Sequence, residues 1–321
     1  MIHPGDDVSK EGVAPGGSAP GVDPAAGPVH RAGFIALVGR PNAGKSTLLN
    51  RVLGRKLAIV TPKPQTTRHR ILGIENRPHS QLLFVDTPGL HEPRNLLGKR
   101  MVKVAQKSLA DADLGLWVVD ASAGLTAEDA TLGAELAASG RPLVVAANKL
   151  DRIGRDGLIV FLARIGEILP GRDVVPVSAT TGENLPELLA TVERGLPESP
   201  PLYPSDAQTD LPEKFFASEL IREQLLLATH EEVPYQSAVR IETFTEREGR
   251  DLVVIEAVIL VARPSHRAIV IGQGGQRLKE IGRRARLELE KFLSTRIYLQ
   301  LFVKVDERWF TSGAKLDELG L

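Results

Sequence analysis

The stretch GRPNAGKS, residues 39–46, decides how the first half of this 321-residue chain folds. It fits the pattern G-x-x-x-x-G-K-[ST], follows an apolar run and opens a stretch with helical spacing, as a phosphate-binding P-loop does. Its two glycines let backbone N–H groups face a phosphate, and the start of the helix adds a positive dipole end. A glycine-rich turn that binds nothing would not need this strand–loop–helix setting. The residues predicted to line the phosphate site are Gly39, Arg40, Pro41, Asn42, Ala43, Gly44, Lys45, Ser46 and Thr47.

Short apolar runs alternate with amphipathic stretches on the C-terminal side of this loop. Alternation of this length predicts parallel βαβ units with right-handed crossovers, and hence a mostly parallel, doubly wound α/β sheet. The exception is 68–76 with 81–85, whose short separation predicts an antiparallel hairpin at one edge. The expected strands are 33–38, 82–85, 114–119, 142–147 and 174–177. The expected helices lie near 45–54, 97–109, 126–139, 155–168 and 184–195.

A second motif, LLFVDTPG at 82–89, ends a predicted strand with a carboxylate and then a glycine. Asp86 is placed to hold Mg²⁺ through water, with the Ser46 hydroxyl as another ligand. The Gly89 amide can sense a γ-phosphate, and Lys45 can supply a point charge across the β- and γ-phosphates. Alone, D-T-P-G is an ordinary turn, but after a P-loop it predicts the metal side of a nucleotide site.

The segment 55–70 between these two motifs contains QTTR at 65–68. A threonine there can complete Mg²⁺ coordination while GTP is bound and let go after hydrolysis, which makes the segment a two-state element. Its basic residues have two interpretations, a solvated face or an RNA contact, and we favour the solvated face. They are Lys63, Arg68, His69 and Arg70.

The motif NKLD at 148–151 predicts which base is bound. The Asp151 carboxylate can accept hydrogen bonds from guanine N1–H and N2–H₂, a donor pair that adenine lacks. Lys149 can lie over the base plane, and Asn148 can brace the loops. Ser178, Ala179 and Thr180 follow the last predicted strand and are placed to close over the base. Together the motifs predict a guanine nucleotide.

The composition narrows the class of protein. Apolar residues make up 42% and charged residues 25%, which is typical of a globular chain. No apolar run approaches the ~20 residues that span a bilayer, and the N-terminus resembles no secretory signal. Cysteine is absent, which excludes disulfides, thiol catalysis and cysteine-based metal sites and suits a reducing cytoplasm. Because the net charge is zero, the overall electrostatics predict no partner. Any affinity for nucleic acid would need local clustering of basic residues.

The two ends of the first domain have a composition unlike its interior. The first 31 residues hold six glycines and five prolines, have little to bury and predict a disordered arm. Five prolines between residues 196 and 213 predict a stiff connector. Beyond it the element order predicts an α+β module. Its expected elements are a helix (215–230), two strands (236–245, 251–262), one or two helices (265–293) and a strand (296–305).

The informative stretch of this module is VIGQGGQRLK at 270–279. Its glycine turn fits G-x-x-G, the loop with which KH domains clamp a short run of single-stranded nucleotides. Glycines suit that task because the phosphodiester backbone comes against bare main chain, and because a helix start follows. The residues expected to touch RNA are Ile271, Gly272, Gln273, Gly274, Gly275, Arg277, Leu278 and Lys279.

Charge clusters around this turn. From 263 to 296, nine Lys and Arg stand against three Glu, which is the electrostatic footprint of nucleic-acid binding. The alternative is a solvated helix stabilised by pairs such as Arg284–Glu288 and Arg286–Glu290. The glycine turn embedded in this basic flank favours RNA binding.

GRPNAGKS, QTTRHR, DTPGLH and NKLD together resemble the Era branch of the TrmE–Era–EngA–Obg class of translation GTPases. The order α-β-β-α-α-β resembles a type II KH fold, so the likeness covers nearly all of 32–310. It implies an α/β P-loop GTPase domain followed by a smaller α+β type II KH domain. The implied segments are an arm (1–31), the G domain (32–198), a Pro-rich linker (199–213), the KH domain (214–310) and a tail (311–321).

This resemblance also implies an activity and partners. They are hydrolysis of GTP to GDP and phosphate, assembly of the small (30S) ribosomal subunit and 16S rRNA maturation in a bacterial cytoplasm. The KH domain would bind single-stranded RNA near the 3′ end of 16S rRNA. A monomer with weak peripheral association with the inner membrane is also implied, although the sequence shows no amphipathic anchor or lipidation signal of its own.

The family likeness further implies metal ligands. Leu90 stands where signalling GTPases carry a catalytic glutamine, so help from a K⁺ ion is implied instead. Asn42, Thr61 and Thr66 would surround K⁺, and Thr67 would ligate Mg²⁺ with Ser46 and Asp86. The implied catalytic groups are Lys45, Thr67 and Gly89.

Three other functions are considered. A non-enzymatic RNA-binding protein with a degenerate G domain conflicts with the joint presence of the phosphate, metal and base motifs. A TrmE-like tRNA-modification GTPase conflicts with the absence of cysteine, of a large helical insert and of an N-terminal cofactor domain. A tandem G domain of the EngA type is excluded because only one P-loop occurs.

Overall fold

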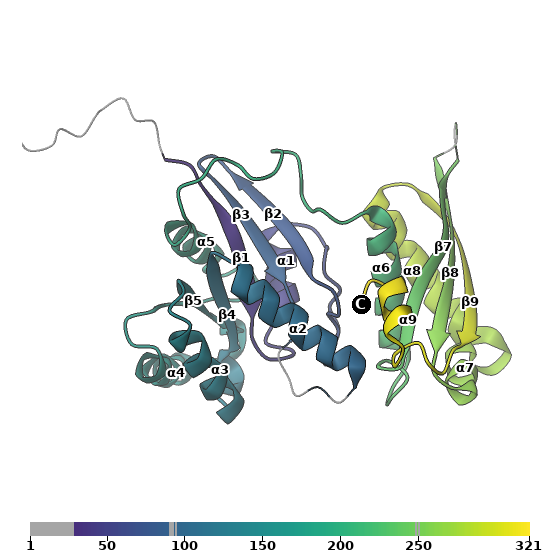
Figure 1. Cartoon of the computed structure of the whole chain (residues 1–321), viewed down its shortest axis with the longest axis horizontal. Helices are drawn as coiled ribbons and strands as arrows, with labels where there is room; N and C mark the ends of the chain where they lie inside the picture. The colour runs from purple at the N-terminus through teal and green to yellow at the C-terminus, as the bar shows by residue number, and fades with distance from the viewer. Residues whose placement is uncertain (1–28, 90–92, 94, 248, 250) are drawn as a thin grey trace, which may run out of the picture.

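The structure is a computed structural model that describes residues 29–89, 93, 95–247, 249 and 251–321. Two layered units lie side by side, each with its own sheet, and an extended connector joins them (Figure 1). In the described part of the chain, no helix is both long and apolar enough to cross a bilayer. The arm predicted over 1–31 lies, except for its last three residues, outside the described residues.

The first unit holds a six-stranded sheet in the order β2-β3-β1-β4-β5-β6. All neighbouring strands are parallel except β2 and β3, which form the predicted antiparallel hairpin at one edge. The doubly wound α/β architecture is therefore confirmed. The strands are β1 (Arg31–Val38), β2 (Ile71–Arg77), β3 (Ser80–Asp86), β4 (Leu114–Asp120), β5 (Leu143–Asn148) and β6 (Asp173–Pro176).

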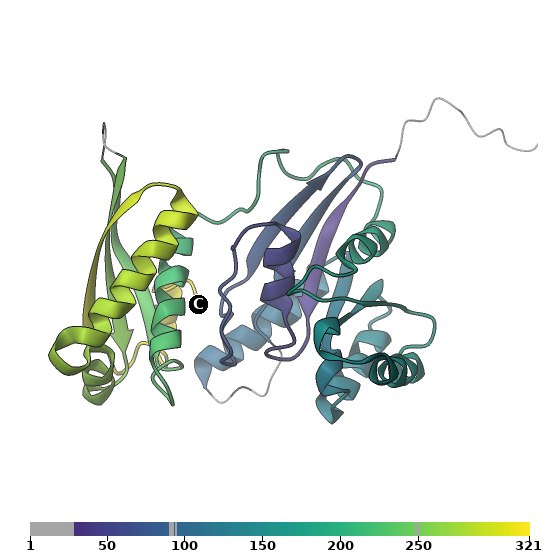
Figure 2. The same ribbon diagram turned by 180° about the vertical axis from the view of Figure 1, so that it is seen from behind.

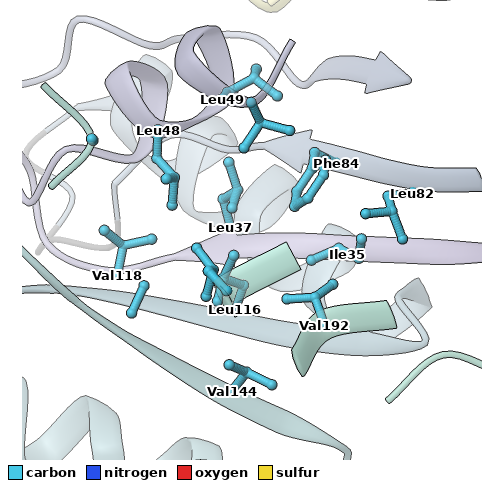
Figure 3. Close-up of a cluster of buried hydrophobic side chains, with 14 of the residues drawn as sticks. Ile35, Leu37, Leu48, Leu49, Leu82, Phe84, Leu116, Val118, Val144 and Val192 are labelled. Atoms are coloured by element: carbon cyan, nitrogen blue, oxygen red, sulfur yellow. The ribbon is translucent and has the colours of Figure 1, made fainter. Parts of the chain in front are cut away.

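Helices cover both faces of this sheet. On one face Leu48 of α1 and Val192 of α5 pack on Ile35, Leu37 and neighbouring strand residues, all fully buried (Figure 3). The other face packs against α3 and α4 around the buried Trp117. The helices are α1 (Lys45–Val52), α2 (Leu96–Asp111), α3 (Ala127–Ala138), α4 (Arg155–Ile168) and α5 (Leu185–Arg194).

The beginning and the end of this unit are joined. Arg31, the first residue of β1, forms an antiparallel bridge with Glu198, just beyond α5. The Ala32 N–H donates to the Pro197 carbonyl at 3.3 Å, and Arg31 also forms an ion pair with Glu198.

The second unit packs two long helices on one face of a three-stranded sheet, β7-β8-β9. Strands β7 and β8 are antiparallel, and β8 and β9 are parallel, which confirms the predicted α+β module. Its elements are α6 (Glu213–Ala228), β7 (Ser237–Glu246), β8 (Leu252–Val261), α7 (Pro264–Ile271), α8 (Gln276–Leu293) and β9 (Arg296–Val305).

A short helix that the sequence did not predict, α9 (Gly313–Glu318), follows this sheet. Its Leu316 packs with the fully buried Trp309 against Ala238 and Leu260 of the sheet, and against α2 of the first unit. The last residues of the chain thus lie at the junction of the two units, where Figure 1 marks the C-terminus.

Candidate functional site

The P-loop adopts the conformation that its glycines allow. Gly39 and Gly44 both have positive φ, 145° and 105°. A Cβ at Gly39 would lie 2.3 Å from the Val118 carbonyl oxygen, and one at Gly44 would lie 2.1 Å from Asn148 Nδ2. Both positions therefore need glycine because the neighbouring strands leave no room, and α1 starts directly after them.

Lys45 lies inside this loop. Its Nζ donates to the carbonyls of Gly39 at 2.8 Å and Arg40 at 3.0 Å. Burial lowers the pKa of Lys45 to about 8, and the nearby Asp86 carboxylate partly offsets that effect. The loop thus holds a buried ammonium group, and an anion bound beside it would favour its charged form.

Oxygen atoms converge at the end of β3. Ser46 Oγ donates to Asp86 Oδ2 at 2.6 Å and lies 2.9 Å from Thr67 Oγ1, which is itself 3.4 Å from Asp86 Oδ2. Asp86 Oδ1 is buried and has no hydrogen-bond partner among the residues that the structure describes. Burial raises the pKa of Asp86, and Lys45 opposes the rise. An all-oxygen donor set with an orphaned carboxylate oxygen fits a small hard cation such as Mg²⁺.

The residues predicted to surround K⁺ lie beside the P-loop. Thr61 Oγ1 and Thr66 Oγ1 are 2.7 Å apart, and Thr66 also donates to the Lys63 carbonyl at 2.7 Å. Asn42, with a φ of 63°, donates from Nδ2 to the Pro62 carbonyl at 3.0 Å. The structure therefore brings these side chains together, with the Asn42 amide directed at the loop that carries the threonines.

One cleft joins most of the predicted phosphate and metal residues. Gly89 lies close to the P-loop, because a Cβ there would be 3.1 Å from the Pro41 nitrogen. Leu90 lies outside the described residues. The predicted residues that line the cleft are Pro41, Asn42, Gly44, Lys45, Ser46, Thr47, Thr61, Thr66, Thr67 and Gly89.

The predicted base loops are tied to the P-loop. Asn148 donates from Nδ2 to the Ala43 carbonyl at 2.8 Å, and its Oδ1 accepts from the Ala179 N–H at 2.9 Å. Ser178 Oγ donates to Asp151 Oδ1 at 2.6 Å. Lys149 has a φ of 67° and leaves the strand in a left-handed turn. This arrangement places the Asp151 carboxylate beside the loop that begins at Ser178.

Two residues beside the base loops, Asp120 and Arg51, were missed by the sequence interpretation. Asp120, at the end of β4, forms an ion pair with Lys149. Burial alone would raise the pKa of Asp120, but hydrogen bonds from Lys149 and Ser122 lower it below its ordinary value. Arg51 donates to the carbonyls of Ala179 and Thr180. Asp120 had a detectable signal, since it ends a buried strand as Asp86 does.

Arg40 differs from its P-loop neighbours. Its Nε donates to Asp129 Oδ1 of α3 at 2.8 Å, and its Nη1 lies 3.7 Å from Glu128. The second missed carboxylate, Asp129, also caps α3 through Thr126. Arg40 therefore ties the P-loop to a neighbouring helix and does not line the cleft.

The glycine turn of the second unit connects α7 to α8. Gly272, Gly274 and Gly275 have positive φ of 72°, 57° and 79°. A Cβ at Gly272 would lie 2.7 Å from Arg277 Cβ, but Gly274 and Gly275 face open space. Gln273 and Gly274 are exposed, whereas Ile271 is half-buried. Arg277 donates back to the Ile269 carbonyl.

A groove runs from this turn between α8 and β9. Of the predicted RNA residues, Gly275, Leu278 and Lys279 line it. Helical spacing along α8 is a signal that could have added the lining residues of its following turns. The wall formed by β9 carries no such signal, because it belongs to another element. The lining residues that were missed are Gly282, Arg283, Arg286, Leu299 and Leu301.

The basic residues of α8 are only partly neutralised. Arg283 and Arg284 both pair with Glu280, whose pKa their hydrogen bonds lower to about 2. The pair between Arg286 and Glu290 is present at 3.6 Å. The expected ion pair between Arg284 and Glu288 does not form, because Glu288 pairs with Lys56 of the first unit instead.

The basic residues of segment 55–70 do not form the solvated face that the sequence favoured. Arg68 is 4% exposed and donates to the carbonyls of Ser237 and Pro234 in the second unit. Lys63 donates to two carbonyls at the end of α6, and His69 is hydrogen-bonded to Gly320. Arg70 is the most accessible of the four: it pairs with Asp210, and its side chain is 40% exposed. Both earlier interpretations are wrong for Arg68, because it holds the two units together.

Two family profiles match separate parts of the chain. Residues 34–149 match the family of 50S ribosome-binding GTPases, and residues 232–310 match the KH domain family. The first match contains the P-loop and Asp86, and the second contains the glycine turn at 272–275.

Whole-chain relatives combine the two parts in the same order. GTPase Era from Geotalea daltonii is 45% identical over 90% of this chain and 97% of its own length. GTPase Era from Syntrophus aciditrophicus is 45% identical over 91% of this chain and 95% of its own length.

Two solved structures of Era proteins also match nearly the whole of this chain. A variant of Aquifex aeolicus Era bound to GDP·AlF₄⁻ is 41% identical, with a TM-score of 0.87 over 90% of this chain and 99% of its own. Era in complex with MgGDPNP and nucleotides 1506–1542 of 16S ribosomal RNA is 41% identical, with a TM-score of 0.87 over 91% of this chain and 99% of its own. The chain therefore belongs to the Era family of GTPases.

Proposed function

We propose that this protein hydrolyses GTP to GDP and phosphate, binds RNA, and acts in assembly of the small (30S) ribosomal subunit and in 16S rRNA maturation. The observation that carries the proposal is the likeness to an Era protein that holds both MgGDPNP and nucleotides 1506–1542 of 16S rRNA. This chain has a cleft for the first ligand and a basic groove for the second. The predicted division into arm, G domain, linker, KH domain and tail is part of the proposal.

In this proposal the base loops select guanine. The Asp151 carboxylate accepts from guanine N1–H and N2–H₂, while Ser178 holds that carboxylate in place through its own hydrogen bond. Lys149, oriented by Asp120, lies over the base plane. Asn148 links the base loop to the P-loop, so the base and phosphate ends of the nucleotide are positioned together. Ala179 and Thr180 close over the base.

Mg²⁺ is held by Ser46, Thr67 and, through water, Asp86. The bound ion would neutralise charge on the phosphate oxygens during hydrolysis. Lys45 supplies a second positive charge at the β- and γ-phosphates, and the Gly89 amide contacts the γ-phosphate. The hydrogen bonds among the Ser46, Thr67 and Asp86 oxygens support the assignment, because they bring the three proposed ligands within 3.4 Å of one another.

K⁺ is the proposed activator, with Asn42, Thr61 and Thr66 around it. A monovalent cation there would stabilise charge developing between the β- and γ-phosphates. Support comes from the proximity of the Thr61 and Thr66 hydroxyls to a loop that Asn42 contacts. We expect hydrolysis to be slow and to be faster in KCl than in NaCl at matched ionic strength. Equal rates in the two salts would rule out the activation.

The RNA-binding turn clamps the phosphodiester backbone, and the groove beside it takes the bases. Open space at Gly274 and Gly275 and the basic residues of α8 support this assignment. The proposed contacts are the predicted set, Ile271, Gly272, Gln273, Gly274, Gly275, Arg277, Leu278 and Lys279, extended by Gly282, Arg283, Arg286, Leu299 and Leu301.

The experiment that tests the role is crosslinking in cells followed by sequencing of bound RNA. A Gly274→Asp, Gly275→Asp variant places carboxylates where the phosphates would lie, and both sites have room for a side chain. Gly140→Asp, Gly171→Asp is the matched control, because these glycines also have positive φ and open space but lie in the first unit. We expect the 3′ end of 16S rRNA with the wild type and the control, and its loss with the first variant.

Two results would contradict the proposal. Equal recovery of RNA from all three proteins would place the RNA elsewhere on the molecule. Absence of ribosomal RNA from the wild type would leave a GTPase without the assigned role in ribosome assembly.

We also propose that the protein is a cytoplasmic monomer with weak peripheral association with the inner membrane. The proposal rests on family membership. Fractionation of cells at low and high salt tests it: a membrane-bound fraction that high salt releases is the expected result. A protein that high salt leaves in the membrane fraction would contradict it.

A further inference from the structure

The loop 55–70, called here the first switch, is held largely by the second unit. Lys56 Nζ lies 2.6 Å from Glu223 Oε2 of α6 and 2.7 Å from Glu288 Oε2 of α8. The Val60 N–H donates to Glu223 Oε1 at 3.0 Å. Both views of the molecule show this loop on the side of the first unit that faces α6 (Figures 1 and 2).

The α6 face toward the first switch contains a buried ion pair. Arg222 and Glu219 are each 3% exposed, and Arg222 donates from Nε to Glu219 Oε1 at 2.7 Å and from Nη2 to Glu219 Oε2. Two charges removed from water cost free energy that their attraction alone does not reliably repay. Stabilisation of α6 alone therefore does not account for this buried ion pair.

Its third contact indicates a further role. Arg222 Nη2 also donates to the Thr66 carbonyl oxygen of the first switch. That carbonyl belongs to the planar peptide group that joins Thr66 to Thr67. A hydrogen bond that fixes the direction of the carbonyl therefore also fixes the position of the Thr67 nitrogen and Cα. Thr67 Oγ1 in turn lies 2.9 Å from Ser46 Oγ and 3.4 Å from Asp86 Oδ2.

We propose that Arg222, oriented by Glu219, is a positioning residue for GTP hydrolysis. It holds the peptide group between Thr66 and Thr67 so that the Thr67 hydroxyl stands at the Mg²⁺ position. The inference rests on the proposed function, since it gives the RNA-binding unit a part in the GTPase site. Because coupling is reciprocal, any movement of α6 away from the first switch releases Thr67, and any loss of the Thr67–Mg²⁺ contact loosens α6.

The test is single-turnover GTP hydrolysis by Arg222→Met. We expect a rate about tenfold lower at saturating nucleotide, since the lost hydrogen bond involves a charged group. The Mg²⁺ concentration for half-maximal rate should rise, whereas GDP affinity should stay unchanged because the P-loop and base loops do not contact Arg222. Arg222→Lys keeps one donor but not the paired geometry, so it should recover part of the rate.

Removing one partner leaves Glu219 buried without its cation, which could unfold the protein. The double variant Glu219→Met, Arg222→Met removes both charges and avoids that outcome. It should fold, as judged by thermal melting, and should show the same slow hydrolysis as Arg222→Met. Arg247→Met, on the exposed end of the β7–β8 hairpin, is the matched control and should behave as the wild type.

The outcomes separate this inference from the proposed function. A wild type that does not hydrolyse GTP contradicts the proposed function itself. A wild type that hydrolyses GTP, with a folded double variant of equal rate and equal Mg²⁺ dependence, overturns the positioning role alone. A loss of GDP affinity in step with the rate would also overturn it, because it would show general damage to the site.

Discussion

Two glycine turns precede helices in this molecule, and they need glycine for different reasons. At Gly39 and Gly44 of the P-loop, a Cβ would lie 2.3 Å and 2.1 Å from atoms of neighbouring strands. At Gly274 and Gly275 of the RNA-binding turn, a Cβ would meet no atom of the described residues within 4 Å. All of these glycines have positive φ, so backbone conformation alone does not distinguish the two turns.

The difference shows what fixes each sequence pattern. The interior of the first unit fixes the P-loop, because Val118 and Asn148 fill the space that a side chain would take. In the second turn Gly272 is confined by Arg277, but the open space at Gly274 and Gly275 leaves room for a ligand to approach the main chain. Substitution of a glycine that the interior fixes should lower both the stability of the protein and its ligand binding. Substitution of a glycine that a ligand fixes should lower mainly ligand binding.

The largest effect is expected for Gly44→Ala. The new Cβ would clash with Asn148 and strain a left-handed backbone, which should lower the free energy of unfolding by about 3 kcal/mol. GDP binding should be abolished at the same time, as calorimetry and thermal melting would show. Gly54→Ala is the matched control, since Gly54 also has positive φ but faces open space. Unchanged GDP binding in Gly44→Ala would contradict the conclusion that the interior of the first unit fixes the P-loop.

The next effect concerns the charge enclosed by the P-loop. The pKa of Lys45 is lowered to about 8 in the free protein, and a bound phosphate should raise it. The contribution of this charge to GDP affinity is therefore complete only well below pH 8 and is lost progressively as the pH rises through 8. Affinity should fall about tenfold between pH 7 and pH 9.

Calorimetry across that pH range checks the prediction on Lys45. Lys45→Arg keeps its charge throughout and should remove the pH dependence, even if it binds more weakly. The same dependence in both proteins would assign the titration to another group.

A smaller effect is expected at the second turn for Lys279→Ala. Lys279 lines the groove, is exposed, and should contact phosphate, so its loss should weaken single-stranded RNA binding by about threefold at low salt. The slope of log affinity against log salt should fall by about 1, with stability and GDP binding unchanged. Lys103→Ala, on the exposed surface of α2, is the control. An unchanged salt slope would place Lys279 outside the RNA path.

A comparably small effect is expected for Gly274→Ala, on stability and not on binding. With open space for the methyl group, only the positive φ is unfavourable, and the free energy of unfolding should fall by about 1 kcal/mol. Chemical denaturation measures it against the wild type. A loss as large as that of Gly44→Ala would mean that the interior fixes both turns.

Local patterns predicted most of the fold. The strands, the edge hairpin and the two domain classes follow from apolar spacing, which reports burial directly. The unpredicted α9 lies in a short stretch whose only buried apolar residue is Leu316, too few to show a period. The nucleotide-binding roles of the P-loop, Asp86 and the base loop were predicted because each combines a chemical group with a strand end, and those roles stay predictions.

Long-range contacts were not predictable in the same way. Arg68 reads as a surface cation in sequence, yet it is buried against carbonyls of Pro234 and Ser237 more than 160 residues away. The wall of the RNA groove formed by Leu299 and Leu301 is likewise distant in sequence from the glycine turn. The Arg68 contacts depend on how the two units dock, and the groove depends on how β9 packs beside α8. No periodicity along the chain encodes either arrangement.

The bridge between Arg31 and Glu198 has a consequence for engineering. Because the first strand begins beside the point where the chain leaves α5, the six-stranded unit has adjacent ends. A short linker could join those ends, and new termini could be opened at Gly140, where the chain turns with open space around it. The nucleotide-binding unit is thus suited to circular permutation and to insertion as a cassette into a loop of another protein.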